Sequence, residues 1–288
     1  MALTLEQLLD HSTGLVSLPA VAMRLNQMVD DPNATVIDIG HLISQDPALT
    51  IRLLKLANSP FYGLTHEIDT ISRAVTVIGI KQIRDLVLAT EVTRVFHEML
   101  NDVVSMEAFW RHSIYCGLAA RMLAKHGLPR KGEFLFICGL LHDIGRLLIY
   151  KHEPKAAHEA FLLGLRRRGE MSPTQAEKEI LGYDHAEVGG ALAQRWQLPQ
   201  SLQSCIFYHH NPAGAGEFQI EASIVHIANS IAHMAELDTR DERDVPPIQP
   251  QAWERIQLTA AVLPEIIEKA QQQVVEVESL LLRDGEVF

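Results

Sequence analysis

Leu140-Leu141-His142-Asp143-Ile144-Gly145 is the most informative segment of this 288-residue chain. It continues an apolar run that begins at Phe134, so an imidazole and a carboxylate would lie at the end of a buried helix. Imidazole suits Zn, Fe, Ni or Cu, whereas carboxylate suits harder ions, and the mixture indicates a transition metal. Water bound to such an ion loses a proton near neutral pH and becomes a nucleophile. His142 and Asp143 are therefore our candidate catalytic residues.

Other histidines accompany this pair at spacings that fit separate helices. Ten of the 14 histidines fall between His112 and His233. Ligands from facing helices, all aimed inward, commonly build a metal site in a helical fold. His226 and Asn229, three residues apart, share a helix face. The histidines that we consider candidate ligands, besides His142, are His112, His185, His209 and His210. We interpret as surface or core residues His11, His41, His66, His97, His126, His152, His158 and His233.

Around these segments the apolar residues have helical spacing. One stripe comprises Val36, Ile39, Leu42 and Ile43, and the next comprises Leu49, Leu53 and Leu56. Val75-Thr76-Val77-Ile78 is β-branched but short, and we interpret it as a helix with a branched buried face. We find no alternating runs of strand length joined by hairpin turns. The sequence therefore predicts an all-α protein, a multi-helix bundle.

Several helix boundaries can be predicted from single residues. Thr35 with Asp38 resembles a capping box. Asp46, followed by a proline, is a good helix start, because the carboxylate accepts free N–H groups and proline at the first position loses nothing. Ser72 is a plausible cap for the segment through residue 78, and Gly79 breaks the pattern there.

Composition excludes several classes of protein. The chain has 25 Lys and Arg against 36 Asp and Glu, a net charge of −11, so we expect no direct binding of nucleic acid. Three scattered cysteines do not make a disulfide framework and fit a reducing compartment. No signal peptide is evident, and the longest apolar run is far short of the about 20 residues that span a bilayer. We expect a cytoplasmic protein without membrane contact.

The His-Asp segment, with His112 before it, resembles the HD superfamily of metal-dependent phosphohydrolases. More narrowly, the chain is similar to the HDOD family over about residues 15 to 235. Together the matching segments are specific, although His-Asp alone would be weak. They are Ser17-Leu18-Pro19-Ala20-Val21, Ile43-Ser44-Gln45-Asp46-Pro47-Ala48-Leu49, Leu56-Ala57-Asn58-Ser59-Pro60-Phe61-Tyr62-Gly63, Ile71-Ser72-Arg73-Ala74-Val75-Thr76-Val77-Ile78-Gly79, Phe109-Trp110-Arg111-His112-Ser113 and Asp184-His185-Ala186-Glu187-Val188-Gly189.

The resemblance implies a bacterial helical signalling protein. Residues 1–100 would be the N-terminal helical part specific to HDOD proteins, and residues 101–236 the HD-like part with the His-Asp site. The pattern resets near Asn101–Ser105, and a charged, Pro-rich segment at Leu237–Gln251 would begin a third part, 237–288, whose helices pack on the body. Many family members lack parts of the metal site and are thought to be regulatory.

The resemblance also implies a ligand set. His112 matches the first HD histidine, and His142 and Asp143 match the central pair. The related HD-GYP phosphodiesterases have extra histidines that resemble His185, His209 and His210. The predicted metal ligands are thus His112, His142, Asp143, His185, His209, His210 and Asn229, for a divalent Fe, Mn, Zn, Co or Ni ion.

Two departures from the HD pattern weaken an enzymatic interpretation. Asn229 stands where the final HD aspartate is expected, and an amide offers a carbonyl oxygen but no charge. The residues after His210 lack the Gly-Tyr-Pro signature, so hydrolysis of cyclic dinucleotides is unsupported. Asp143 would then be the only clear anionic ligand. Because poorly neutralised buried charge is costly, one ion or none is favoured over two, unless Asp184 or Glu179 helps.

Three functions remain open from the sequence. The leading hypothesis is a regulatory module that binds signalling or regulatory proteins, or a small nucleotide-like ligand, and acts in trans. The alternative is a metal-dependent phosphohydrolase acting on a nucleotide or phosphoester, in which Arg146 or Lys151 would steady phosphate unless it faces away. The third is a scaffold with a vestigial site. A homodimer contact by the C-terminal helix is also open.

Overall fold

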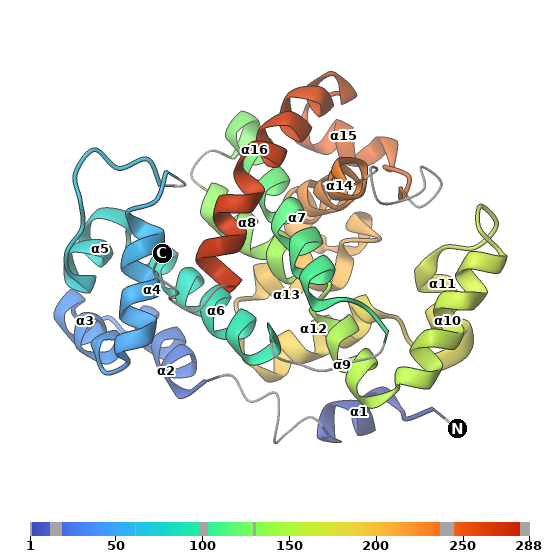
Figure 1. The fold of residues 1–288 in the computed structure, drawn as a ribbon, viewed down its shortest axis with the longest axis horizontal. Coiled ribbons are helices and arrows are strands. Elements are labelled where there is room, and N and C mark those ends of the chain that lie inside the picture. The colour runs from blue at the N-terminus through green and yellow to red at the C-terminus, as the bar shows by residue number, and fades with distance from the viewer. Residues whose placement is uncertain are drawn as a thin grey trace. The chain divides into compact units, whose positions relative to one another are not determined.

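The computed structural model describes residues 2–11, 19–60, 62–97, 103–128, 131–236 and 245–282. Every regular element within these ranges is a helix, as Figure 1 shows, so the all-α prediction is confirmed. Within the same ranges, no helix combines the length and the apolar character needed to cross a bilayer. Ser17, Leu18 and Phe61 of the quoted motifs lie outside the described residues, as does 237–244 of the charged segment.

The chain divides into two compact units. One comprises Met1–Ser17 and Met99–Val274, and the other comprises Leu18–Glu98 and Val275–Phe288. The boundary near residue 275 falls inside the last helix, α16 (Leu263–Leu282). The three-part division at 100 and 236 stays a prediction, and its boundary residues 100, 101 and 237 lie outside the described residues.

In its described residues, the smaller unit contains α2 to α6, the end of α16 and the predicted caps. Its complete helices are α2 (Ala20–Val29), α3 (Val36–Ser44), α4 (Pro47–Ala57), α5 (Ile71–Ile78) and α6 (Ile80–His97). Thr35 and Asp38 form the capping box of α3, and the Asp46 side chain accepts the Leu49 N–H at the start of α4, as predicted. Gly79 ends α5 with φ +109°, a conformation that favours glycine.

The predicted cap of α5 is wrong. Thr70, not Ser72, caps this helix, and its hydroxyl accepts the Arg73 N–H. Ser72 lies inside α5, against Gly40 of α3, so closely that a Cβ on Gly40 would collide with its hydroxyl. Ser72 therefore packs in the contact between α3 and α5 and does not cap the start of α5.

The larger unit holds the remaining helices, which Figure 1 colours mainly green to orange. They are α1 (Leu5–His11), α7 (Met106–Gly127), α8 (Gly132–Leu141), α9 (Ile144–His152), α10 (Pro154–Arg166), α11 (Pro173–Leu181), α12 (His185–Arg195), α13 (Gln200–Tyr208), α14 (Gln219–Ala235), α15 (Pro250–Ile256), the first part of α16, and the 3₁₀ turns η2 (Pro212–Gly214), η3 (Gly216–Phe218) and η5 (Ala260–Val262).

Glycines bring the helices of the larger unit close enough to form a site. α7 packs on both α8 and α14, and Gly139 of α8 lies against the backbone of Cys116 in α7. Gly145 of α9 lies against the backbone of His185 and Gly189 in α12, where a Cβ would collide. The first contact brings α7 and α8 together, and the second brings the start of α9 to the start of α12. Cys116, Cys138 and Cys205 are all buried, and none of them forms a disulfide.

Candidate metal centre

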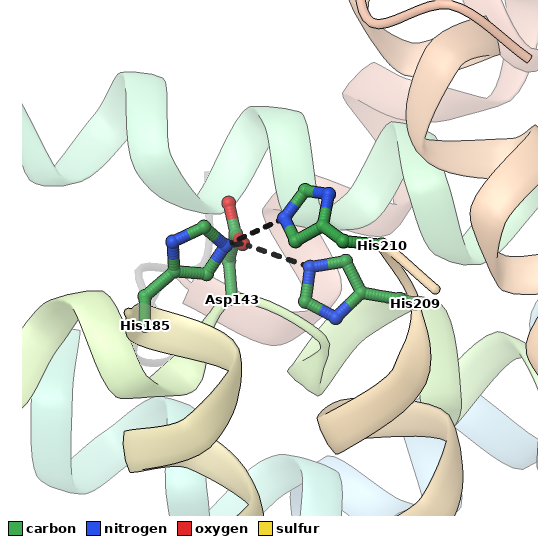
Figure 2. A group of neighbouring side chains, drawn as sticks. All are labelled: Asp143, His185, His209 and His210. Carbon is green, nitrogen blue, oxygen red and sulfur yellow. Dashed lines mark hydrogen bonds and ion pairs between the residues drawn. The ribbon is translucent and has the colours of Figure 1, made fainter. Parts of the chain in front are cut away.

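The candidate ligands come mostly from helix ends. His142 ends α8, and Asp143 precedes the first residue of α9. His185 is the first residue of α12, where Asp184 and Glu187 form a capping box. His209 ends α13 and His210 follows it. Figure 2 shows that the side chains of Asp143, His185, His209 and His210 point toward one another.

The first group of ligands surrounds Oδ1 of Asp143. Nε2 of His185 lies 3.0 Å from this oxygen, and Nε2 of His209 lies 3.7 Å from it. Nε2 of His210 is 2.9 Å from Nε2 of His185. One atom from each of the four residues falls within 4.8 Å of the others, which is close enough for a single ion to contact all of them.

The second group of candidate ligands lies on the side of Oδ2, the other oxygen of Asp143. Nε2 of His142 is 3.6 Å from Oδ2. The ring of His112, from α7, lies 5.5 Å from the His142 ring between centroids, and its Nε2 is 3.1 Å from Oδ1 of Asn229 in α14. The structure thus brings the five predicted histidine ligands together around the Asp143 carboxylate, and Asn229 contacts one of them, His112. That they bind metal stays a prediction.

Two of the imidazoles have the tautomer that a metal ligand needs. The Nδ1–H of His142 donates to the Gly139 carbonyl at 2.6 Å, and that of His209 donates to the Ile206 carbonyl at 2.7 Å. Each ring therefore presents a lone pair on Nε2. Both Nε2 atoms are buried, and neither has a hydrogen-bond partner in the described part of the chain. Metal-bound histidines are oriented in this way, so the residues fit a metal ion.

Burial keeps these two rings neutral. It lowers the pKa of His142 to about 4, with His112 and His185 adding repulsion and Asp143 opposing. It also lowers the pKa of His209 well below its usual range, again with neighbouring histidines adding to the effect. A neutral imidazole is the form that ligates metal.

His112 faces an acceptor on each side. Oε2 of Glu236 lies 3.0 Å from its Nδ1, and Oδ1 of Asn229 lies 3.1 Å from its Nε2. A ring that carries a proton on each nitrogen donates to both oxygens. A ring with a bare Nε2 needs a cation there, or a half-turn of the amide that presents its NH₂ group.

A family model gives the chain its place among known proteins. The model of the HDOD domain matches residues 15–212. This chain belongs to the HDOD domain family. An uncharacterised protein of Treponema pallidum (strain Nichols) is 29% identical over 236 residues, which are 81% of this chain and 45% of that protein. The HDOD chain therefore spans about half the length of the curated relative that it matches.

Solved structures share the HDOD fold. An HDOD domain protein of unknown function from Geobacter sulfurreducens has a TM-score of 0.72 at 23% identity and covers 97% of this chain and 98% of its own. A protein of Shewanella amazonensis SB2B, described as a candidate phosphohydrolase, has a TM-score of 0.73 at 29% identity. The match covers 95% of this chain and 97% of that protein. These likenesses support the fold.

Glu177 is the carboxylate that the sequence interpretation missed. From α11 of this HDOD chain, its Oε2 accepts both the Nδ1–H of His185 at 2.6 Å and the backbone N–H at 2.9 Å. The acids suggested from sequence lie elsewhere. Asp184 caps α12 and pairs with Lys178, and Glu179 pairs with Arg167 on the surface.

The two carboxylates on either side of His185 determine its charge. Burial and Arg146 oppose protonation, but Glu177 and Asp143 outweigh them and raise the pKa of His185 to about 9. Burial also opposes ionisation of Asp143, and Arg146 and the histidines nevertheless hold its pKa well below the usual range. Without metal, His185 is therefore an imidazolium between two carboxylates, and a metal ion would replace its Nε2 proton.

Three further side chains complete the surroundings. Arg146 faces the centre, with Nε 2.9 Å from Oδ2 of Asp143. The ring of His233, expected to be a surface or core residue, lies 4.6 Å from the His112 ring between centroids. His226 donates from Nδ1 to the His209 carbonyl and accepts the Gln249 N–H on Nε2, so it stabilises the core by hydrogen bonds.

Proposed function

We propose that this HDOD chain is a regulatory signalling module that binds a divalent transition metal ion at its His-Asp centre. One observation carries the proposal. The Nε2 atoms of His142 and His209 are buried without a hydrogen-bond partner in the described residues, and both lie within 3.7 Å of a carboxylate oxygen of Asp143. Leaving such atoms unsatisfied costs stability, and coordination to an ion removes that cost.

The donor set favours Fe, Zn, Co or Ni over Mg or Ca, because imidazoles outnumber carboxylates, and the Asp143 oxygens also admit Mn. When bound, such an ion lowers the pKa of coordinated water and polarises phosphoryl oxygens. The chain's own residues hold it in place: Glu177 fixes the ring of His185, and the Gly139 and Ile206 carbonyls fix the rings of His142 and His209.

Three observations favour regulation over hydrolysis. Asn229 supplies no charge where an HD enzyme is expected to have an acid. The Gly-Tyr-Pro signature is missing from the sequence. The side chains of His142, His185 and His209 are each 0% exposed, so these three ligands are closed off from solvent, whereas His210 is half-buried. We infer that ion occupancy changes how the module binds a signalling or regulatory protein, without direct contact to nucleic acid.

Metal content tests the proposed function. We expect tag-free protein to bind a transition metal after incubation with Fe, Mn or Zn, measured by elemental analysis. Asp143→Ala and His209→Ala should abolish binding, because each removes a ligand from the centre. His158→Ala, an exposed histidine of α10, is the matched control and should bind as the wild type does. Metal-free wild-type protein would contradict the proposal.

The partner is tested by affinity capture with metal present and with metal removed. We expect a signalling protein to be retained saturably by the metal-loaded wild type and to be lost with Asp143→Ala. Capture that is the same for both proteins would contradict a regulatory role of the ion.

A phosphohydrolase is the second candidate function. The convergence of five histidines on Asp143 favours it, and so does the likeness to the Shewanella amazonensis protein. A panel of nucleotides and phosphoesters, with Mn, Fe, Co, Ni or Zn added, tests this function. Turnover that His142→Ala abolishes would establish it, and turnover equal to that of the variant would exclude it for the compounds tested.

A further inference from the structure

Arg146 is a cation built into the centre. Its Nε lies 2.9 Å from Oδ2 of Asp143 as an ion pair, and its Nη1 lies 3.5 Å from Oε1 of Glu177. The Tyr150 hydroxyl, one turn along α9, hydrogen-bonds the same guanidinium. The side chain of Arg146 is 23% exposed, so solvent screens these contacts only in part. Its Nη2 also lies 3.5 Å from Nε2 of His185. Glu177 and Tyr150 thus hold a fixed positive charge beside Asp143 and His185.

The two oxygens of Asp143 serve different neighbours. Oδ1 faces the imidazoles of His185 and His209, at 3.0 and 3.7 Å. Oδ2 faces His142 at 3.6 Å and Arg146 at the shorter 2.9 Å. A carboxylate that bridges two metal ions gives one oxygen to each of them. Here the guanidinium already holds one of these oxygens.

We propose that Arg146 takes the place of a second metal ion, so that the centre binds one ion, held by Asp143, His185, His209 and His210. The proposal rests on the proposed function, because it presupposes that the centre binds metal. Three imidazoles and one carboxylate oxygen make a complete four-ligand set for a transition ion.

The other half of the centre is poorly suited to a metal ion. Its members are His112, His142 and Asn229, all without negative charge. Nε2 of His112 is already 3.1 Å from the Asn229 amide. Of the two oxygens of Asp143, the one nearer His142 is the oxygen paired with Arg146, and the Glu236 carboxylate contacts Nδ1 of His112, away from its Nε2. A divalent ion bound to Nε2 of His112 and of His142 would have to share the Asp143 oxygen with the guanidinium, and poorly compensated buried charge is strongly disfavoured.

The test counts Mn²⁺ ions per chain in the wild type and in Arg146→Gln. Elemental analysis gives the number, and electron paramagnetic resonance separates an isolated Mn²⁺ ion from a spin-coupled pair. We expect one isolated ion in the wild type and a coupled pair in Arg146→Gln. Arg146→Lys keeps the charge and should bind one ion. The control is Arg195→Gln, which removes a cation paired with Asp10 on the surface and should also bind one.

The outcomes separate this proposal from the proposed function. Two ions in the wild type, or one in a folded Arg146→Gln, would overturn the role of Arg146 and leave metal binding intact. No ion in the wild type would overturn both.

A measurement on the wild type alone covers the case in which Arg146→Gln does not fold. Anomalous scattering from Mn²⁺-soaked crystals should locate one ion among His185, His209 and His210. An ion between His112 and His142 would overturn the proposal.

A variant outside the proposed ligand set gives a further check. His112→Ala should retain the Mn²⁺ ion, and loss of the ion from this variant would count against the assignment.

Discussion

Glu177 is the residue whose mutation should report most directly on the metal centre. It holds the His185 ring by its Nδ1–H and also accepts the backbone N–H at the start of α12. Outer carboxylates that orient a ligating histidine typically change metal affinity by about 10- to 100-fold when mutated. We expect Glu177→Gln to lower the affinity for Mn²⁺ by about this factor, measured by competition with a chelator of known affinity.

Glu179 provides the matched control for that experiment. It lies on the same helix two residues further, and its side chain is 48% exposed and paired with Arg167. Glu179→Gln makes the same chemical change outside the centre and should leave the affinity unchanged. If Glu177→Gln and the wild type bind Mn²⁺ with equal affinity, Glu177 does not orient His185 for metal binding.

The ligands could be predicted from sequence because short motifs mark them. His142-Asp143 is contiguous, and His209 and His210 are adjacent. Glu177 could not be found in this way, because it meets His185 only through the packing of α11 beside α12. Its neighbours Asp184 and Glu179 have the same chemistry, and only the structure shows which carboxylate faces the ring.

At the scale of elements, the contact between α9 and α12 determines how closely Asp143 approaches His185. A Cβ on Gly145 would collide with the backbone of His185 and Gly189. Gly145→Ala should therefore separate the two helix starts, lower the free energy of unfolding by about 1–3 kcal/mol and weaken Mn²⁺ binding. Denaturant unfolding and metal titration on the same samples measure the two effects.

Gly164→Ala controls for the glycine change itself. Gly164 lies inside α10, and a Cβ there would meet only the Ala176 side chain at 3.8 Å, an ordinary contact. Alanine favours a helix interior over glycine by about 0.5–1 kcal/mol, so this variant should be as stable as the wild type or more stable. Metal binding that falls equally in both variants would contradict the role of the α9–α12 contact.

Helix boundaries were predictable where one residue dominates the geometry. Asp46 and Gly79 were assigned correctly because a cap with a following proline and a breaking glycine act locally. Ser72 was assigned wrongly, because Thr70 offers a hydroxyl group two residues earlier, and Ser72 packs against Gly40 instead. Helix ends can therefore be predicted from local sequence unless tertiary contacts involve the same residue.

At the scale of the whole molecule, metal should stabilise one of the two units directly. Every candidate ligand lies in the unit that contains Met99–Val274. A ligand at 100 times its Kd stabilises the state that binds it by about 2.7 kcal/mol. We expect Mn²⁺ to slow amide hydrogen exchange in that unit, with little change in Leu18–Glu98. Asp143→Ala should abolish the effect, and equal slowing throughout the chain would contradict it.

The absence of disulfides gives the helix-end ligands a further consequence. Asp143, His185 and His209 are far apart in sequence, and an ion held by all three would join the starts of α9 and α12 to the end of α13. None of Cys116, Cys138 and Cys205 forms a disulfide, so the chain has no covalent bond between such distant segments. The ion would act as a reversible cross-link, and the metal supply of the cell would determine when that cross-link forms.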